Sequence, residues 1–414
     1  MDAVTSKRGH GLIEAGRRFA AGGSGMVARL AAPGFQRIID RIDAALDSGT
    51  LHAQLPDKSR RTLGGRAPGF ECTVELRSWN ALVRLAGSGS VGWYEAWAAG
   101  EWTSPDPVPL FALFMQHAAA LGDTARAKGA MRAALKVAHL VNRNTHAGAQ
   151  RNIAAHYDLG NDFYAAWLDP TMSYSSALWR AGDDLEAAQR RKWAALADRL
   201  GAPDSVLEIG CGWGGLAGYL DGRGNTVNAI SLSEEQLHWA RERHPGPDFR
   251  KQDYRDTFGQ YDAIVSVEMV EALGHEYWGE FMDCIARNLK PDGRAAIQFI
   301  AMRDDLFNAY AESADFIQAY IFPGGLLIRT SEFRALAEER GLRWVDQVDF
   351  GQDYAETLKV WRDNFDRAVS EGRSPAGFDA SFVDLWRYYL MYCEGGFRGG
   401  GIDVHQVTLR KGIA

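Results

Sequence analysis

The pattern of apolar and polar positions changes in character along the chain. From about residue 151 to the C-terminus, short apolar runs alternate with longer segments in which apolar residues recur at helical spacing. Short apolar runs between polar turns are typical of buried strands, and the wider spacing is typical of amphipathic helices. Regular alternation of the two predicts a doubly wound α/β fold with a mostly parallel sheet. The expected strands are 205–209, 226–230, 248–251, 262–267, 295–301 and 343–348, and the clearest helices are 234–243, 277–289 and 331–340.

The N-terminal part of the chain has a different order of elements. A helical segment comes first, at 35–46. Three strand-like segments follow it, at 49–56 (a strand that runs into a turn), 62–65 and 72–76, and then two further helical segments at 78–86 and 110–120. Strands and helices that do not alternate are typical of a small α+β domain. We therefore expect a weakly structured arm (1–30), an N-terminal α+β domain (31–123), a basic helical linker (124–150) and the α/β domain (151–414).

Composition and charge exclude several classes of protein. The 414 residues are 46% hydrophobic and 24% charged, which is ordinary for two or three globular domains. A net charge of −7 argues against a general affinity for nucleic acid. The widely spaced cysteines argue against a disulfide framework or a metal site and favour a reducing cytoplasm. No segment approaches the roughly 20 apolar residues that span a bilayer, so any membrane contact is expected to be peripheral.

One basic segment stands out in this acidic chain. Residues 124–157 contain no Asp or Glu, and the segment could be a solvated helical face that joins two domains. Alternatively it binds anionic headgroups at a membrane surface, where each cation contributes about 1 kcal/mol. The cations assigned to this role are Arg126, Lys128, Arg132, Lys136 and Arg143.

A glycine-rich turn follows the first expected strand of the α/β domain. Residues 206–215 read VLEIGCGWGG, and Gly210, Gly212 and Gly214 allow positive φ and close approach of a ligand. The G-x-G-x-G spacing differs from the dinucleotide fingerprint, and the next strand ends without the acidic residue that binds a ribose there. Together with LKPDGR at 289–294 before a further strand, these features look like a class I S-adenosylmethionine (SAM) methyltransferase.

A longer series of motifs makes the resemblance more specific. It consists of 152–176, the glycine turn, 231–236, 252–255, 267–274, 321–325, 354–358 and 389–397. In this order the motifs resemble the cyclopropane-fatty-acyl-phospholipid synthase family, which includes the mycolic acid cyclopropane synthases. The resemblance extends over residues 33–412 and implies a Rossmann-like catalytic domain after an N-terminal lipid-handling domain.

The resemblance implies a SAM site at matching positions. Ser231 and Gln236 would serve the ribose hydroxyls, which would account for the missing acidic residue. Asp253 and Tyr254 would face the adenine, although a turn residue and a core aromatic are the alternatives. The full implied set is Tyr174, Ser175, Gly210, Gly212, Gly214, Ser231, Leu232, Gln236, Asp253 and Tyr254.

The methyl acceptor in the family is the cis double bond of an acyl chain in a membrane phospholipid. Methyl transfer leaves a carbocation, and a base must then remove a proton. Family members are thought to use a bicarbonate held by a Glu, a His, a Tyr and the backbone around a Cys. Glu271 matches the Glu and Tyr354 matches the Tyr. The alternatives are a carboxylate favoured by a helix start and a structural phenol.

Two positions depart from the family pattern. Ser176 stands for the Cys and can keep a backbone contact, while Gln298 stands for the His and can donate a hydrogen bond but cannot take a proton. Cyclopropanation is the first expectation. With a weakened base the cation could shift a hydride, so C-methylation to a methyl-branched or methylene chain is the second.

Further alternatives concern the substrate and its access. Phe316, Tyr320 and Phe322 could line an acyl tunnel or form a helix-packing core. An amine N-methyltransferase and an inactive lipid-binding protein are less favoured, because a soluble amine needs no lipid-handling domain and the implied SAM residues are intact. The expected location is the cytoplasmic face of the inner membrane leaflet, and a homodimer is left open.

Overall fold

The computed structural model describes residues 8–17, 32–122, 159–312 and 314–412. The chain divides into two compact units. Unit 1 comprises residues 1–142, 305–323 and 376–402, and unit 2 comprises 143–304, 324–375 and 403–414. The sequence predicted consecutive domains, whereas segments 305–323 and 376–402 pack with the N-terminal part of the chain. Packing partners this distant in sequence are not visible in local periodicity.

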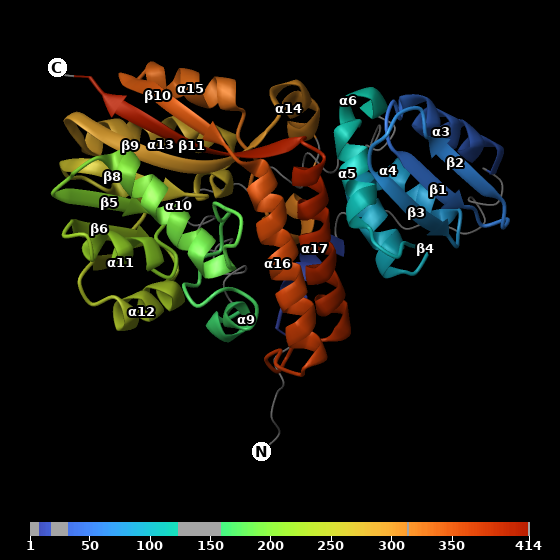
Figure 1. Cartoon of the computed structure of the whole chain (residues 1–414), viewed down its shortest axis with the longest axis horizontal. Coiled ribbons are helices and arrows are strands. Elements are labelled where there is room, and N and C mark those ends of the chain that lie inside the picture. The colour runs from blue at the N-terminus through green and yellow to red at the C-terminus, as the bar shows by residue number, and fades with distance from the viewer. Residues whose placement is uncertain (1–7, 18–31, 123–158, 313, 413–414) are drawn as a thin grey trace. The chain divides into compact units, whose positions relative to one another are not determined.

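Unit 2 contains a seven-stranded sheet in the order β10-β11-β9-β8-β5-β6-β7 (Figure 1). Strands β5 to β9 pair in parallel, whereas β10 and β11 pair antiparallel. This confirms the doubly wound α/β fold. The strands are β5 (Ser205–Ile209), β6 (Thr226–Ser231), β7 (Asp248–Lys251), β8 (Tyr261–Val267), β9 (Leu289–Met302), β10 (Leu342–Asp349) and β11 (Ile402–Lys411).

Helices cover both faces of this sheet. Ala296 of β9 belongs to the core shared with α10, α11 and α12, whereas Phe299 packs on Phe333 of α15. Successive side chains of a strand point to opposite faces, so these two positions identify two helical layers. The helices are α9 (Asn161–Ala165), α10 (Leu185–Leu200), α11 (Gly215–Asp221), α12 (Glu234–Arg243), α13 (Trp278–Asn288), α15 (Thr330–Glu338) and α16 (Gly351–Ser370).

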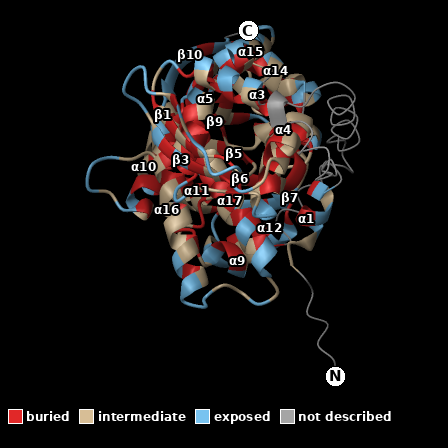
Figure 2. Cartoon of the chain, turned by 90° about the vertical axis from the view of Figure 1, so that its right-hand side faces the viewer, coloured by how far each residue is buried: buried red, intermediate tan, exposed pale blue. Residues whose placement is uncertain are grey.

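Capping residues begin two of the helices that flank the site. The Asp184 carboxylate accepts the Ala187 amide at the start of α10, and the Ser233 hydroxyl accepts the Gln236 amide at the start of α12. Such side chains satisfy amide groups that have no partner inside the helix. Figure 2 shows buried residues (red) along the strands and exposed residues (pale blue) on the outer helix faces.

Unit 1 is an α+β structure, as predicted. Its four-stranded sheet has the order β2-β1-β3-β4, in which β1 pairs antiparallel with β2 and parallel with β3. The strands are β1 (Thr50–Gln54), β2 (Arg60–Gly64), β3 (Glu71–Leu76) and β4 (Trp102–Thr103). The helices are α1 (His10–Arg17), α3 (Ala32–Ala45), α4 (Asn80–Ala98), α5 (Val108–Gln116), α6 (Ala118–Leu121), most of α14 (Asp304–Ala311), the π-helix η5 (Ile317–Ile321) and α17 (Ala380–Arg398).

Helices α5 and α17 pack at close range within unit 1. A Cβ at Gly395 would lie 2.3 Å from the Phe111 Cβ, and a Cβ at Gly399 would lie 2.5 Å from the Ala112 carbonyl oxygen. Glycines at both positions therefore let the two backbones approach. This contact brings segment 376–402 into unit 1.

The predicted elements agree closely with those observed. Each expected strand of the α/β domain has a counterpart, and the helix predicted at 234–243 matches α12. Strand β11 was not predicted, and α4 runs well beyond the expected 78–86, with a break at Gly89 (φ 60°). The basic linker 124–150 lies outside the described residues.

Candidate active site

The glycine turn joins β5 to α11 with three left-handed residues. Gly210, Gly212 and Gly214 have φ of 84°, 53° and 82°. A Cβ at Gly210 would lie 2.6 Å from the Met269 Cγ, and a Cβ at Gly214 would lie 2.8 Å from the Phe249 ring. Packing thus demands glycine at the first and third positions. At Gly212 the nearest described atom to such a Cβ is 4.0 Å away, so the turn leaves room there for a ligand.

That nearest atom is the side-chain nitrogen of Gln236, in the first turn of α12. Gln236 is 3% exposed, and its Nε2 has no hydrogen-bond partner among the described residues. A buried donor without an acceptor is costly, so it points to an absent group that carries oxygen acceptors. The ribose hydroxyls of SAM are such acceptors, and the position predicted for them fits.

Two other predicted SAM residues follow β7. The Tyr254 hydroxyl is buried without a described partner. The Asp253 carboxylate is bound by Arg255, at 2.9 Å to Nε and 2.7 Å to Nη2, and it caps the short helix η2 (Tyr254–Asp256). Asp253 therefore has a turn role in the structure, and its contact with adenine stays a prediction.

The remaining predicted SAM residues lie near the same edge of the sheet. The Tyr174 ring packs against Trp361, with centroids 5.3 Å apart, and the Ser175 hydroxyl lies 2.7 Å from the Lys192 Nζ. Ser231 ends β6, where its hydroxyl accepts the Ser233 amide at 3.3 Å, and Leu232 follows it. The carboxyl ends of parallel strands are where ligands bind in this type of fold.

A glutamate that the sequence analysis did not select lies at the centre of the polar cluster. Glu268 follows β8 directly and has a φ of 47°. Its Oε1 accepts hydrogen bonds from the Ser176 amide at 2.9 Å and the Gln298 Nε2 at 2.7 Å. Its Oε2 accepts the Tyr354 hydroxyl at 2.7 Å. Three of the four predicted catalytic residues thus meet on one carboxylate.

Distant segments hold these donors in place. The Gln298 Oε1 accepts the Gln406 Nε2 of β11 at 3.0 Å, so the opposite end of the Gln298 amide faces Glu268. Helix α16 carries Tyr354, and its Thr357 hydroxyl accepts the Ala177 amide at 3.1 Å. The segment that supplies the Ser176 amide is thereby tied to the helix that supplies the phenol.

The fourth predicted catalytic residue has a separate environment. The Glu271 Oε1 accepts the Ile300 amide, and its Oε2 is buried without a partner among the described residues. Burial, together with the negative charge of Glu268, raises the pKa of Glu271 to about 8. Glu271 therefore carries a proton at neutral pH.

A buried lysine lies beneath the cluster and was also not selected from sequence. Lys192 of α10 is 1% exposed and donates to the Ser175 hydroxyl at 2.7 Å and to the Gln189 Oε1 at 2.5 Å. Burial lowers the pKa of Lys192 to about 8, while the charges of Glu268, Asp169 and Glu208 act in the opposite direction. Burial likewise raises the pKa of Glu208 to about 8.

Signals for both missed residues were present in the sequence. Glu268 is an acidic residue at the carboxyl end of a predicted strand, where ligands bind in this type of fold. Lys192 shares the apolar face of its helix with Ala188 and Leu196. A lysine on a buried helical face is unusual enough to indicate a specific partner.

The residues predicted to contact lipid fall into two groups. Phe316 and Tyr320 are buried in an aromatic cluster of unit 1, where both pack against Tyr94. Phe322 lies 6.4 Å, centroid to centroid, from Tyr389. These contacts are those of a helix-packing core. The alternative, that the three residues line an acyl tunnel, stays a prediction. Arg126, Lys128, Arg132, Lys136 and Arg143 lie outside the described residues. Of the helices that the structure does describe, none is long and apolar enough to cross a membrane.

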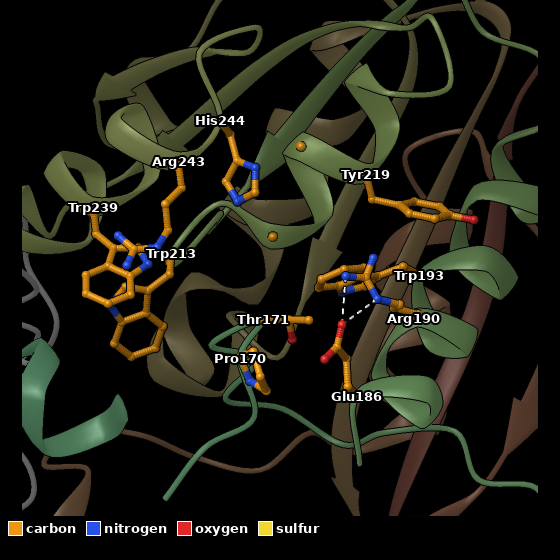
Figure 3. A pocket seen from close by; sticks show the side chains of 12 residues that line it. Pro170, Thr171, Glu186, Arg190, Trp193, Trp213, Tyr219, Trp239, Arg243 and His244 are labelled. Carbon is orange, nitrogen blue, oxygen red and sulfur yellow. Dashed lines mark hydrogen bonds and ion pairs between the residues drawn. The ribbon is translucent and has the colours of Figure 1, made fainter. Parts of the chain in front are cut away.

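A separate cavity of about 250 Å³ opens beside α10, α11 and α12 (Figure 3). Trp193, Trp213 and Trp239 contribute to its walls, and the Arg243 guanidinium lies 3.5 Å from the centroid of the Trp239 ring. Neither Glu268 nor its three donors line this cavity. It is distinct from the polar cluster.

Known proteins resemble this chain over most of its length. The profile of the mycolic acid cyclopropane synthetase family matches residues 144–407. The chain is 38% identical to the tuberculostearic acid methyltransferase UfaA1 of Mycobacterium tuberculosis, over 80% of this chain and 81% of that protein. It is 32% identical to the cyclopropane-fatty-acyl-phospholipid synthase of Escherichia coli, over 87% of this chain and 92% of that protein.

A solved structure agrees with the fold. The mycolic acid cyclopropane synthase CmaA1 complexed with SAH and CTAB matches with a TM-score of 0.59 and 27% identity, over 63% of this chain and 98% of that one. The doubly wound sheet is therefore that of a class I methyltransferase, and SAM is the methyl donor. The chain belongs to the mycolic acid cyclopropane synthetase family, a family of SAM-dependent lipid methyltransferases and cyclopropane synthases.

Proposed function

We propose that the protein transfers a methyl group from SAM to a carbon–carbon double bond in an unsaturated acyl chain of a phospholipid. The observation that carries the proposal is the buried carboxylate cluster beside the glycine turn, where Glu268 accepts from Ser176, Gln298 and Tyr354. Its neighbour Met269 packs against Gly210 of the glycine turn, and this contact supports a position of the cluster beside the methyl donor. A sulfonium donor supplies an electrophilic methyl, and this chain supplies a nearby anion.

The reaction needs three things from the protein. An alkene is a weak nucleophile, so it must be held in line with the methyl group and away from water. The double bond forms the new carbon–carbon bond as the carbon–sulfur bond breaks, which leaves a positive charge on the acyl chain. Aromatic faces stabilise such a charge, and the rings of Tyr174 and Trp361 pack against each other in a tilted arrangement next to the Ser175–Ser176 segment. A base must then remove a proton.

We favour a methylene-branched chain as the product. Gln298 stands where the family resemblance places a histidine, and it cannot take up the proton. Burial raises the pKa of Glu268, and the hydrogen bonds from Tyr354, Gln298 and Ser176 act in the opposite direction. Slow proton loss gives the cation time for a 1,2-hydride shift before the new methyl group is deprotonated. The similarity to a tuberculostearic acid methyltransferase supports this order.

Cyclopropanation is the second candidate. It needs the same methyl transfer and the same base, but the ring closes before any hydride moves. Similarity to a cyclopropane synthase over 87% of this chain favours it. From the sequence alone, this product is the first expectation. The surroundings of Glu268 and Gln298 are the reason for reversing that order.

We further propose that the acyl chain is reached at an anionic membrane surface. The support is the basic composition of residues 124–157 and the lipid substrates in the names of the relatives. Binding to anionic vesicles that weakens as salt is raised is the expected behaviour.

Lipid analysis tests the proposed function. Purified protein with SAM and vesicles of an unsaturated phospholipid is expected to add one CH₂ unit per acyl chain by mass spectrometry. Proton NMR of the product then distinguishes exocyclic methylene protons from the upfield protons of a cyclopropane ring. A failure to add CH₂ to any unsaturated phospholipid, in a protein that binds SAM, would refute the proposal.

A further inference from the structure

We infer that the Glu268 carboxylate is itself the proton acceptor and occupies the place that the family resemblance gives to a bound bicarbonate. The enzyme then works without bicarbonate. This inference rests on the proposed function, because it names the base for the same reaction.

The donors around Glu268 carry the inference. The resemblance implied that a Glu, a His, a Tyr and the backbone at a Cys position hold the anion. In this chain the last three positions are Gln298, Tyr354 and Ser176, and all three donate to the two oxygens of Glu268. The Glu position is Glu271, which accepts the Ile300 amide. A carboxylate and a bicarbonate present similar planar oxygen acceptors. One side chain therefore uses the donors that would otherwise hold the small anion.

The backbone at Glu268 supports a functional reason for this residue. Its φ of 47° lies in the left-handed region, where residues other than glycine, asparagine and aspartate are uncommon. The Glu268 amide donates to the Gln298 carbonyl at 2.8 Å, which fixes this conformation. A strained backbone and a half-buried carboxylate are both unfavourable, so their coincidence at one residue points to a function.

Several groups that face Glu268 counteract the effect of burial on its pKa. Burial raises the pKa of Glu268, and the charge of Lys192 is the largest opposing influence, followed by the bonds from Tyr354, Gln298 and Ser176. Glu271 is the carboxyl group that keeps its proton at neutral pH, since its pKa is raised to about 8. Of two neighbouring carboxyls, the one with the donors is thus the base.

Two acidic groups on other elements act on Lys192 together with Glu268. These are Asp169 and Glu208, and the charges of both raise the pKa of Lys192. Burial raises the pKa of Asp169 and of Glu208, which favours their neutral forms. Among the three carboxylates, Glu268 acts most strongly on Lys192.

The proton-transfer step balances without a further reactant. A C–H bond of the newly added methyl group breaks, and its proton passes to a Glu268 oxygen. The electron pair of that bond forms the exocyclic double bond after the hydride shift, or closes the ring without it. Glu268 becomes neutral and later returns the proton to water. A saturated methyl branch would need an additional hydride donor and is not part of this inference.

The variant Glu268→Gly gives a sharp test. Glycine accepts a φ of 47° without strain, so folding is expected to be retained. The three donors would then face the space vacated by the carboxylate. We expect turnover to fall by about 100-fold or more, the usual contribution of a general base, with SAM affinity unchanged by calorimetry. Added bicarbonate or formate should restore part of the activity.

A second variant separates the loss of the base from the loss of volume. Glu268→Gln fills the same space with a neutral amide, so it should be as inactive as Glu268→Gly but not rescued by bicarbonate. Glu338→Gln is the matched control, because Glu338 is an exposed glutamate paired with Arg334 and should leave turnover unchanged.

Binding of the anion gives a readout that does not depend on turnover. ¹³C NMR with labelled bicarbonate is expected to show binding to Glu268→Gly and not to the wild-type protein. Wild-type activity that falls when bicarbonate is removed from the buffer would overturn the inference, and so would full activity of Glu268→Gln. If wild-type protein adds no CH₂ to any lipid, the proposed function fails instead, and this is seen before any variant is made.

Discussion

The two sides of the active site are built in different ways. The glycine turn is one contiguous stretch, and its shape follows from backbone φ values and from packing against Met269 and Phe249. The side that we propose as the proton acceptor gathers Ser176, Gln298, Tyr354 and Glu268 from four separated segments. A ligand that is bound largely through backbone groups depends on the conformation of one short stretch of chain. A base whose pKa is set by its surroundings depends on donors and charges that reach it from several directions.

The largest expected effect is on the contiguous side. Gly210→Ala places a Cβ 2.6 Å from the Met269 Cγ at a φ of 84°. Overpacking and left-handed strain together should lower the free energy of unfolding by about 2 to 4 kcal/mol and greatly weaken SAM binding. Thermal unfolding and calorimetry measure the two effects.

Gly224→Ala is the matched control for that variant. Gly224 also has a positive φ, of 93°, but a Cβ there meets no described atom within 4 Å. It should lose only the smaller conformational contribution, about 1 kcal/mol, and keep SAM binding. Equal losses in the two variants would show that packing against Met269 does not shape the turn.

We expect an effect of intermediate size when Lys192, the buried cation that acts on Glu268, is replaced. Lys192→Met removes the charge that opposes the raised pKa of Glu268, so Glu268 should hold its proton up to a higher pH. The base is active when ionised, and the acidic limb of the kcat profile should therefore move to higher pH by about one unit, a tenfold loss on that limb.

The pH profile distinguishes tuning of the base from simple loss of structure. Arg190→Met alters an exposed cation on the same helix and is expected to leave the profile in place. A lower rate in Lys192→Met with an unmoved profile would mean that Lys192 only supports the fold of the 173–176 segment.

The smallest effect is expected at Glu271. Since its pKa is raised to about 8, Glu271 is protonated at neutral pH, and Glu271→Gln resembles that form closely. We expect turnover to change by about threefold or less, well below the effect of losing a general base. Loss of activity comparable to that of Glu268→Gln would make Glu271 the base.

The same variant makes a prediction about stability. A carboxyl whose pKa is raised on folding stabilises the protein fully below its unfolded pKa of 4.5, and the contribution is lost as pH rises through about 8. Between these values the wild type should lose stability with rising pH more steeply than Glu271→Gln. Denaturant unfolding across that range measures the difference.

Sequence alone determined those features that depend on neighbours along the chain. The alternation of apolar runs predicted β5 to β10, and the helix predicted at 234–243 has the observed bounds of α12. The glycine turn was predicted from its spacing, because steric limits on φ act within single residues. The resemblance also indicated Ser176, Gln298 and Tyr354, which the structure brings together.

Only the tertiary structure decided which carboxylate these residues serve. Glu268 and Glu271 are three residues apart in the sequence and have the same side chain. In the structure the Glu268 carboxylate accepts three hydrogen bonds, whereas the pKa of Glu271 is raised to about 8. The same holds for strand β11, whose Gln406 orients Gln298, and for the return of 305–323 and 376–402 to unit 1. Burial, hydrogen bonding and charge act through space, and the segments that supply them lie far apart along the chain.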